Sequence, residues 1–173
     1  MEVDKIWDEI KDMGSWFSKE DVESFSKLEL REKATILELG TGFGKSTKAL
    51  RLLFPDSDIT TCDPSYQGEL QLLDDIRVNY ISDCGFNLKW NKLIDLLFID
   101  DNHEYKTVEK DIKKYKKFIT KGGYIVCHDY YGTGVEKAVK ELLPESKIIQ
   151  TGEFSQSIWK NNDPYKEERD NTL

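Results

Sequence analysis

The chain has 173 residues and a formal net charge of −8, a length that suits one domain with a continuous core. The acidic balance argues against a nucleic-acid partner, because non-specific binding to phosphates needs a basic surface. The three cysteines form no C-x-x-C pair, so we expect neither a disulfide framework nor a zinc site. No apolar run reaches membrane-spanning length and the N-terminus is acidic, which predicts a cytoplasmic protein without a membrane partner.

Two helices are predicted within residues 1–30. Apolar residues at i, i+3, i+4 and i+7 indicate an amphipathic first helix, namely Val3, Ile6, Trp7 and Ile10. Ser18 is the expected N-cap of the second helix. Both helices are expected to pack on the core or over a binding pocket.

Residues 31–160 alternate between strand and helix patterns and form the predicted main domain. Strands are expected at residues 36–39, 59–62, 78–81, 93–99, 124–127, 147–150 and 156–159, and helices at 47–54, 70–73, 105–115 and 135–142. This alternation predicts an α/β fold, a Rossmann-like, doubly wound, mostly parallel seven-stranded sheet with helices on both faces. Residues 161–173 are polar and are predicted to form a loosely held tail.

A glycine turn follows the first strand, with Gly40, Gly42 and Gly44 in alternate positions. Glycines let the backbone pass close to a ligand, and Asp63, which ends the second strand, can bind both hydroxyls of a ribose. The pattern predicts a nucleoside-containing ligand. A tight strand-to-helix turn without a ligand remains the alternative.

The glycine spacing differs from the dinucleotide pattern G-x-G-x-x-G, since the third glycine comes one position early. Glu38, just ahead of the turn, would repel a pyrophosphate but suits a ligand with an ammonium and a sulfonium, as in S-adenosylmethionine. A P-loop ending at Gly44, Lys45 and Ser46 is disfavoured, because Leu39 stands where its first glycine belongs.

Residues 38–44 resemble motif I of class I S-adenosylmethionine-dependent methyltransferases. Residues 93–105 and 122–130 resemble strands four and five of their small-molecule O-methyltransferase-like branch, which includes macrocin-type sugar methyltransferases. The resemblance runs from about Trp16 to Trp159. It implies an antiparallel final strand, N-terminal helices that form a lid, and a methyltransferase of the EC 2.1.1 class.

The resemblance also implies a set of cofactor-binding residues, which we expect to be Glu38, Gly40, Thr41, Gly42, Gly44, Asp63, Asp83 and Asp100. Asp83 is expected to border the adenine pocket. Asp100 is expected near the methyl donor.

Both histidines of the chain follow strand ends at one predicted sheet edge, His103 after the fourth strand and His128 after the fifth. Methyl transfer needs an oriented acceptor and removal of its proton, so His103 is the candidate catalytic base, with Asp100 beside it. A hydrogen bond from His103 to a backbone carbonyl is the structural alternative. His128 is expected to orient Asp129 or to line the pocket.

Asp100 and Asp129 end adjacent predicted strands and are candidate ligands of Mg²⁺. In the metal-dependent relatives the residue after the second aspartate is typically Asn or Asp, whereas here it is Tyr130. A run of lysines from Lys110 to Lys121 is expected to solvate a helix face and complement the helix dipole.

The sequence therefore predicts transfer of a methyl group from S-adenosylmethionine to an oxygen or nitrogen of a small-molecule acceptor. Two alternatives stay open: a non-catalytic module that binds S-adenosylmethionine or S-adenosylhomocysteine, and an NAD-dependent oxidoreductase. The identity of the acceptor and the formation of a homo-oligomer also stay open.

Overall fold

The computed structural model describes residues 2–163. Its strands are β1 (Thr35–Leu39), β2 (Asp58–Cys62), β3 (Asn79–Ile81), β4 (Ile94–Ile99), β5 (Ile119–His128), β6 (Lys147–Thr151) and β7 (Phe154–Lys160). Its helices are α1 (Glu2–Ile10), α2 (Lys19–Phe25), α3 (Lys45–Leu53), α4 (Leu70–Asp75), α5 (Tyr105–Tyr115) and α6 (Gly134–Leu142), with short 3₁₀ turns η1 (Gly85–Asn87) and η2 (Lys116–Phe118).

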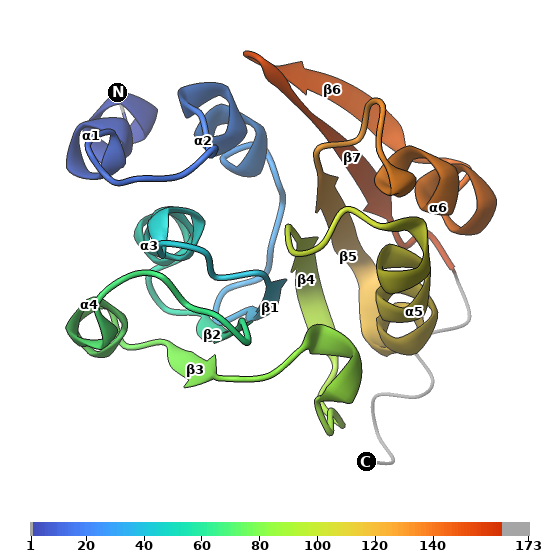
Figure 1. Ribbon diagram of the computed structural model, residues 1–173, viewed down its shortest axis with the longest axis horizontal. Helices are drawn as coiled ribbons and strands as arrows, with labels where there is room; N and C mark the ends of the chain where they lie inside the picture. The colour runs from blue at the N-terminus through green and yellow to red at the C-terminus, as the bar shows by residue number, and fades with distance from the viewer. Residues whose placement is uncertain (1, 164–173) are drawn as a thin grey trace.

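The strands form one seven-stranded sheet in the order β3-β2-β1-β4-β5-β7-β6 (Figure 1). β7 runs antiparallel to both of its neighbours, and the other pairings are parallel. The predicted Rossmann-like sheet with an antiparallel final strand is confirmed. The chain leaves β1 for β2 on one side and returns to β4 on the other, which creates the kind of crevice in which open α/β sheets bind ligands.

Two apolar clusters cover the two faces of the sheet, because successive side chains of a strand point to opposite faces. Leu37 of β1 packs with residues of α5 and α6, whereas its neighbour Ile36 packs with residues of α1, α2 and α3. Every residue of β4 is buried, as expected for a central parallel strand covered by helices on both faces.

The N-terminal helices belong to the second of these clusters. Ile10 of α1 and Val22 and Phe25 of α2 are buried against the sheet side that also carries α3. α2 begins with a capping box, in which the Ser18 hydroxyl accepts from the N–H of Asp21 and the Asp21 carboxylate accepts from the N–H of Ser18. The cap fixes the direction in which α2 leaves the preceding loop.

The structure extends two predicted boundaries. β5 begins at Ile119, five residues before the predicted start at residue 124. The side chain of Asn161 is buried and its Nδ2 donates to the carbonyls of Ile119 and Thr120, so this residue belongs to the domain and not to the predicted tail. Residues 164–173 of that tail lie outside the described residues.

Among residues 2–163, none of the helices is long and apolar enough to cross a membrane.

Candidate functional site

A cavity of about 590 Å³ opens at the carboxyl ends of β1, β2, β4 and β5. The glycine turn, the end of β2 and the loop after β3 line one part of it, and the ends of β4 and β5 line the other. Ser15 and Trp16, from the loop before α2, also contribute to the lining. Of the predicted site residues, the structure brings Gly40, Thr41, Gly42, Asp63, Asp100, His103 and Asp129 to this cavity.

The three glycines of the turn all have positive φ, but they have different surroundings. A Cβ on Gly40 would lie 2.1 Å from the carbonyl oxygen of Asp100, so only glycine fits between the ends of β1 and β4. A Cβ on Gly42 would meet nothing within 4 Å. Gly44 packs against Leu72 and Tyr66 and is not among the residues that line the cavity.

Asp63 is fixed by the glycine turn itself. Its Oδ2 accepts hydrogen bonds from the N–H groups of Thr41 at 3.1 Å and Gly42 at 2.9 Å. Its Oδ1 accepts from the N–H of Ser65 at 2.7 Å. The end of β2 and the turn after β1 therefore form one rigid wall of the cavity.

Glu38 does not line the cavity, which corrects the prediction that it faces a cationic ligand. Its carboxylate is fully buried and accepts hydrogen bonds from the hydroxyls of Ser46, Thr47 and Thr61. Burial raises its pKa to about 7, although the three hydrogen bonds act in the opposite direction. Glu38 thus joins β1 to β2 and to the start of α3, behind the glycine turn.

Asp83 does not line the cavity either, although Cys84, Gly85 and Phe86 do. Its Oδ1 accepts from the N–H of Cys84 and from Nδ2 of Asn87, and the bond from Asn87 is the largest factor lowering its pKa. Asp83 shapes the η1 turn and does not face the cavity.

The η1 turn is also held from α5. The ammonium of Lys114 donates to the carbonyls of Gly85, Phe86 and Leu88, and the Tyr115 hydroxyl donates to the carbonyl of Gly85. The expectation that the lysine run only solvates a helix face is therefore wrong for Lys114. Nothing in its spacing distinguishes Lys114 from its neighbours before the fold is known.

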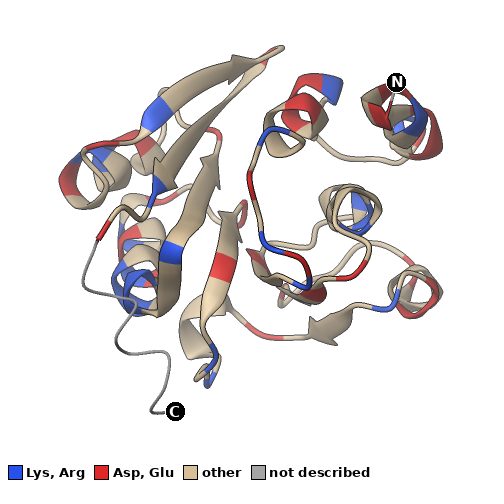
Figure 2. Cartoon of the chain, turned by 180° about the vertical axis from the view of Figure 1, so that it is seen from behind, with Lys and Arg blue, Asp and Glu red and all other residues tan. Residues whose placement is uncertain are grey.

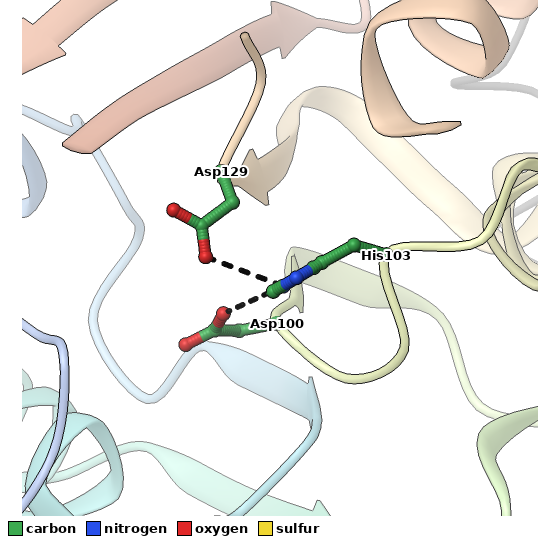
Figure 3. Close-up of side chains that lie close together, drawn as sticks. All are labelled: Asp100, His103 and Asp129. Carbon is green, nitrogen blue, oxygen red and sulfur yellow. Dashed lines mark ion pairs between the residues drawn. The ribbon is translucent and has the colours of Figure 1, made fainter. Parts of the chain in front are cut away.

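Asp100, His103 and Asp129 converge from the ends of β4 and β5 (Figure 3). Nε2 of His103 lies 3.3 Å from Oδ2 of Asp129 and 3.7 Å from Oδ1 of Asp100. The pKa of His103 is raised, chiefly through its interaction with Asp100. The arrangement presents a half-exposed imidazole next to two carboxylates.

His128 lies directly behind this group and is buried. Its Nδ1 is 3.4 Å from both Oδ1 of Asp100 and Oδ2 of Asp129, and its Nε2 is 3.2 Å from Oδ2 of Asp21. Burial by itself lowers the pKa of His128, but Asp100, Asp129 and Asp21 outweigh that effect and raise it. Sequence reasoning missed Asp21, although its capping-box position after Ser18 marks it as an ordered carboxylate.

Two further buried carboxyl groups lie near the η1 side of the cavity. Asp101 lines the cavity, and burial raises its pKa to about 6. Asp111 of α5 is fully buried near Gly85, and burial, reinforced by Asp101, raises its pKa to about 7. Neither residue was singled out from the sequence.

Comparison with known proteins places the chain in a family. A family model described as "Methyltransferase domain" matches residues 37–130, more than half of the chain. An uncharacterized protein of Acanthamoeba polyphaga mimivirus is 41% identical over 66 residues, which cover 36% of this chain. The match spans only 28% of that curated relative.

Several solved structures share the fold. An rRNA methylase from Streptococcus thermophilus superimposes with a TM-score of 0.63 at 17% identity, over 80% of this chain and 93% of that one. The O-methyltransferase NovP superimposes with a TM-score of 0.66 at 12% identity, over 84% of this chain and 81% of that one. Fibrillarin from Aeropyrum pernix, with natively bound S-adenosyl-L-methionine, superimposes with a TM-score of 0.61 at 17% identity. The superposition covers 82% of this chain and 74% of that one.

Proposed function

The chain belongs to the methyltransferase domain family, and from this we propose that it transfers a methyl group from S-adenosylmethionine to an oxygen or nitrogen of a small molecule. One observation carries the proposal. The wall formed by the glycine turn and Asp63 shares a single cavity with His103, so a nucleoside site and a candidate base face the same space.

The cavity residues fit the parts of S-adenosylmethionine. Asp63 is positioned to accept the ribose hydroxyls, and the loop from Cys84 to Phe86 offers the adenine a wall of backbone and aromatic ring. The open space over Gly42 leaves room for the amino-acid part. The described lining carries four carboxylates, Asp63, Asp100, Asp101 and Asp129, which suit a ligand with an ammonium and a sulfonium.

The same charge distribution favours a small acceptor over a nucleic acid. No Lys or Arg lies among the described residues that line the cavity. Figure 2 shows basic and acidic residues interspersed over the chain, with several lysines on α5. A polyanion would meet carboxylates and no Lys or Arg among these lining residues, and electrostatic attraction to phosphates needs basic side chains.

His103 is the residue best placed to accept the acceptor's proton. It lines the cavity, and its Nε2 has carboxylate oxygens on two sides. Carboxylates beside an imidazole stabilise the imidazolium formed when the ring takes a proton. When bound, S-adenosylmethionine supplies the electrophilic methyl group, and the protein orients the acceptor for an in-line approach.

Trp16 offers a surface for the acceptor. It lines the cavity, yet 73% of its area is exposed. Its neighbour Phe17 is buried and packs against Phe98 and His128, which fixes the backbone that carries Trp16. The exposed indole can therefore contact an apolar or cationic acceptor without reorganising the core.

Ligand binding tests the cofactor first. In thermal-shift titrations, S-adenosylmethionine and S-adenosylhomocysteine should stabilise the protein, by about 2.7 kcal/mol at one hundred times Kd, while NAD and ATP should not. Asp63→Asn should weaken this binding. Stabilisation by NAD alone would overturn the proposal in favour of an oxidoreductase.

Catalysis is tested with His103→Gln and a panel of hydroxyl- and amine-bearing small molecules, with release of S-adenosylhomocysteine as the readout. The variant should bind S-adenosylhomocysteine like the wild type but lose turnover by about 10²–10⁴-fold. Cofactor binding without turnover on any acceptor would support a binding module, and methyl incorporation into RNA alone would contradict a small-molecule acceptor.

A further inference from the structure

We propose that Thr133 and Gly134, where the loop after β5 enters α6, are positioning residues that set the distance between the imidazole of His103 and the carboxylate of Asp129. Neither Thr133 nor Gly134 lines the cavity, so both act through the residues that do. The inference rests on the proposed function, in which His103 accepts the proton of the acceptor.

The first argument is that each of the two residues holds one member of the pair by its backbone carbonyl. Oγ1 of Thr133 donates a hydrogen bond to the carbonyl oxygen of Asp129 at 2.8 Å. The N–H of Gly134 donates to the carbonyl oxygen of His103 at 3.0 Å. On the cavity side, Nε2 of His103 lies 3.3 Å from Oδ2 of Asp129 (Figure 3). Two consecutive residues therefore link the backbones of the two residues whose side chains lie together in the cavity.

The second argument is the backbone conformation of Asp129, whose φ of 50° is rare for a residue other than glycine. Lys33 and Arg77, the other such residues in the described part of the chain, do not line the cavity. If β5 continued as a regular strand, Asp129 and His128 would point to opposite faces of the sheet. The left-handed turn instead brings Oδ2 of Asp129 to 3.4 Å from Nδ1 of His128. Such a conformation persists only where neighbouring contacts hold it.

The peptide group between Asp129 and Tyr130 is held at both of its ends. Its carbonyl accepts from Thr133, and its N–H donates to the carbonyl of Ser155 in β7 at 3.2 Å. Ser155 is buried, and its Oγ also accepts from the N–H of Tyr131 at 3.0 Å. Thr133 thus supplies the contact that fixes the Asp129 carbonyl, and with it the direction of the carboxylate.

The third argument is that the start of α6 leaves no space for a side chain at Gly134. A Cβ there would overlap the backbone nitrogen of Tyr105 and lie 2.6 Å from the carbonyl oxygen of His103. Gly134 is not among the glycines with positive φ, so close contact and not backbone conformation requires glycine here. The start of α6 therefore determines where the loop before α5 places His103.

The hydroxyl of Thr133 has two separate tasks. Thr133 is the N-cap of α6, and its Oγ1 accepts from the N–H of Val135 at 3.1 Å. A cap needs only an acceptor, whereas the bond to Asp129 uses the single proton of the hydroxyl. Serine offers an acceptor and a donor, but an ionised aspartate offers only an acceptor. Substitution by serine or by aspartate therefore separates the two tasks.

Imidazole NMR of the ¹⁵N-labelled full chain tests the positions without a cofactor or an acceptor. His103 and His128 are the only histidines of the chain, and His103→Gln assigns their signals. At one fixed pH, Thr133→Asp should shift the Nε2 signal of His103, whereas Thr133→Ser should leave it within the linewidth of the wild type. Thermal unfolding should show that both variants are folded.

Gly132→Asp is the control for the added charge. It places a carboxylate on an exposed neighbouring residue, where a Cβ meets nothing within 4 Å, and it should not shift the His103 signal. Gly134→Ala should displace the loop that carries His103 and shift the same signal, with Gly132→Ala as its control. If Gly134→Ala does not fold, the two Thr133 variants decide the proposal.

Turnover supplies the second measurement, on an acceptor identified by release of S-adenosylhomocysteine. Thr133→Asp should lower kcat by about 10–100-fold, because a small misplacement of a catalytic group is costly. KM and the affinity for S-adenosylhomocysteine should change little, and Thr133→Ser should retain the kcat of the wild type.

An unchanged His103 signal in Thr133→Asp, or equal shifts in Thr133→Asp and Thr133→Ser, would overturn the proposal. If the wild type methylates no acceptor, the proposed function fails. The imidazole signals still decide in that case whether Thr133 and Gly134 position His103.

Discussion

Nε2 of His128 lies 3.2 Å from Oδ2 of Asp21, although 107 positions separate the two residues in the chain. The contact joins the capping box of α2 to the end of β5, among the aromatic rings of Phe17, Phe98 and Phe154. One carboxylate thus serves both the start of a helix and the back of the cavity. The position of the N-terminal helices is therefore coupled to the arrangement of the candidate site.

Loss of Asp21 should destabilise the whole domain. Asp21→Ala removes the capping-box partner of Ser18 and leaves the buried Nε2 of His128 without its carboxylate partner, which should lower the free energy of unfolding by about 2–4 kcal/mol. Urea unfolding of the variant measures this change. Glu20→Ala, at an exposed position of the same turn, is the control, and an equal loss in both variants would contradict a role for the buried contact.

Substitutions at two glycines of the turn should have different effects, one on folding and the other on cofactor binding. Gly40→Ala places a Cβ against the Asp100 carbonyl and should prevent stable folding, measured by circular dichroism and thermal unfolding. Gly42→Ala meets open space and carries only the strain of a positive φ, about 1–2 kcal/mol. The Gly42 variant should fold but bind S-adenosylhomocysteine at least tenfold more weakly, because its methyl group projects into the cavity. Unchanged affinity would place the cofactor elsewhere.

Glu38 should make stability depend on pH in an unusual direction for a carboxylate. Its pKa in the folded protein is about 7, above the ordinary 4.5, so the folded state holds the proton more tightly. This contribution is fully present below pH 4.5 and is lost as the pH rises through 7. It amounts to about 3 kcal/mol for a shift of this size.

Glu38→Gln mimics the protonated form, so the variant should lose less stability than the wild type between pH 5 and pH 8. Denaturant unfolding at several pH values measures the difference. Glu38→Gln should remove only part of this pH dependence. The raised pKa values of Asp101 and Asp111 also make the folded protein less stable as the pH rises. Glu32→Gln, an exposed carboxylate just before β1, should leave the pH profile unchanged.

Lys114 should control the η1 side of the cavity, where we propose that the cofactor's adenine lies. Lys114→Met removes three hydrogen bonds to the carbonyls of the η1 region, which should loosen the turn and weaken S-adenosylhomocysteine binding several-fold. Isothermal titration calorimetry measures the change. The neighbouring Lys113 pairs with Glu109 at the exposed surface, so Lys113→Met should bind like the wild type. If both variants bind equally, the contacts of Lys114 do not hold the site.

The sequence by itself determined the order of strands and helices, the turn of Gly40 and Gly42, the acidic end of β2 and the meeting of Asp100, His103 and Asp129 at one edge. These features depend on apolar periodicity and on backbone conformations that only glycine adopts readily, and both can be read over a few neighbouring residues. Parallel strands then bring their carboxyl ends together.

Only the tertiary structure decided which polar side chains face the cavity and which lie behind it. Glu38 and Asp83 have the spacing of ligand-binding residues, but nearby donors hold both away from the cavity. Asp21 and Lys114 look like ordinary helix-surface residues, yet α2 and α5 direct them to the end of β5 and to the η1 turn. The direction of such a side chain depends on the packing of elements far apart in the chain, and local sequence does not encode that packing.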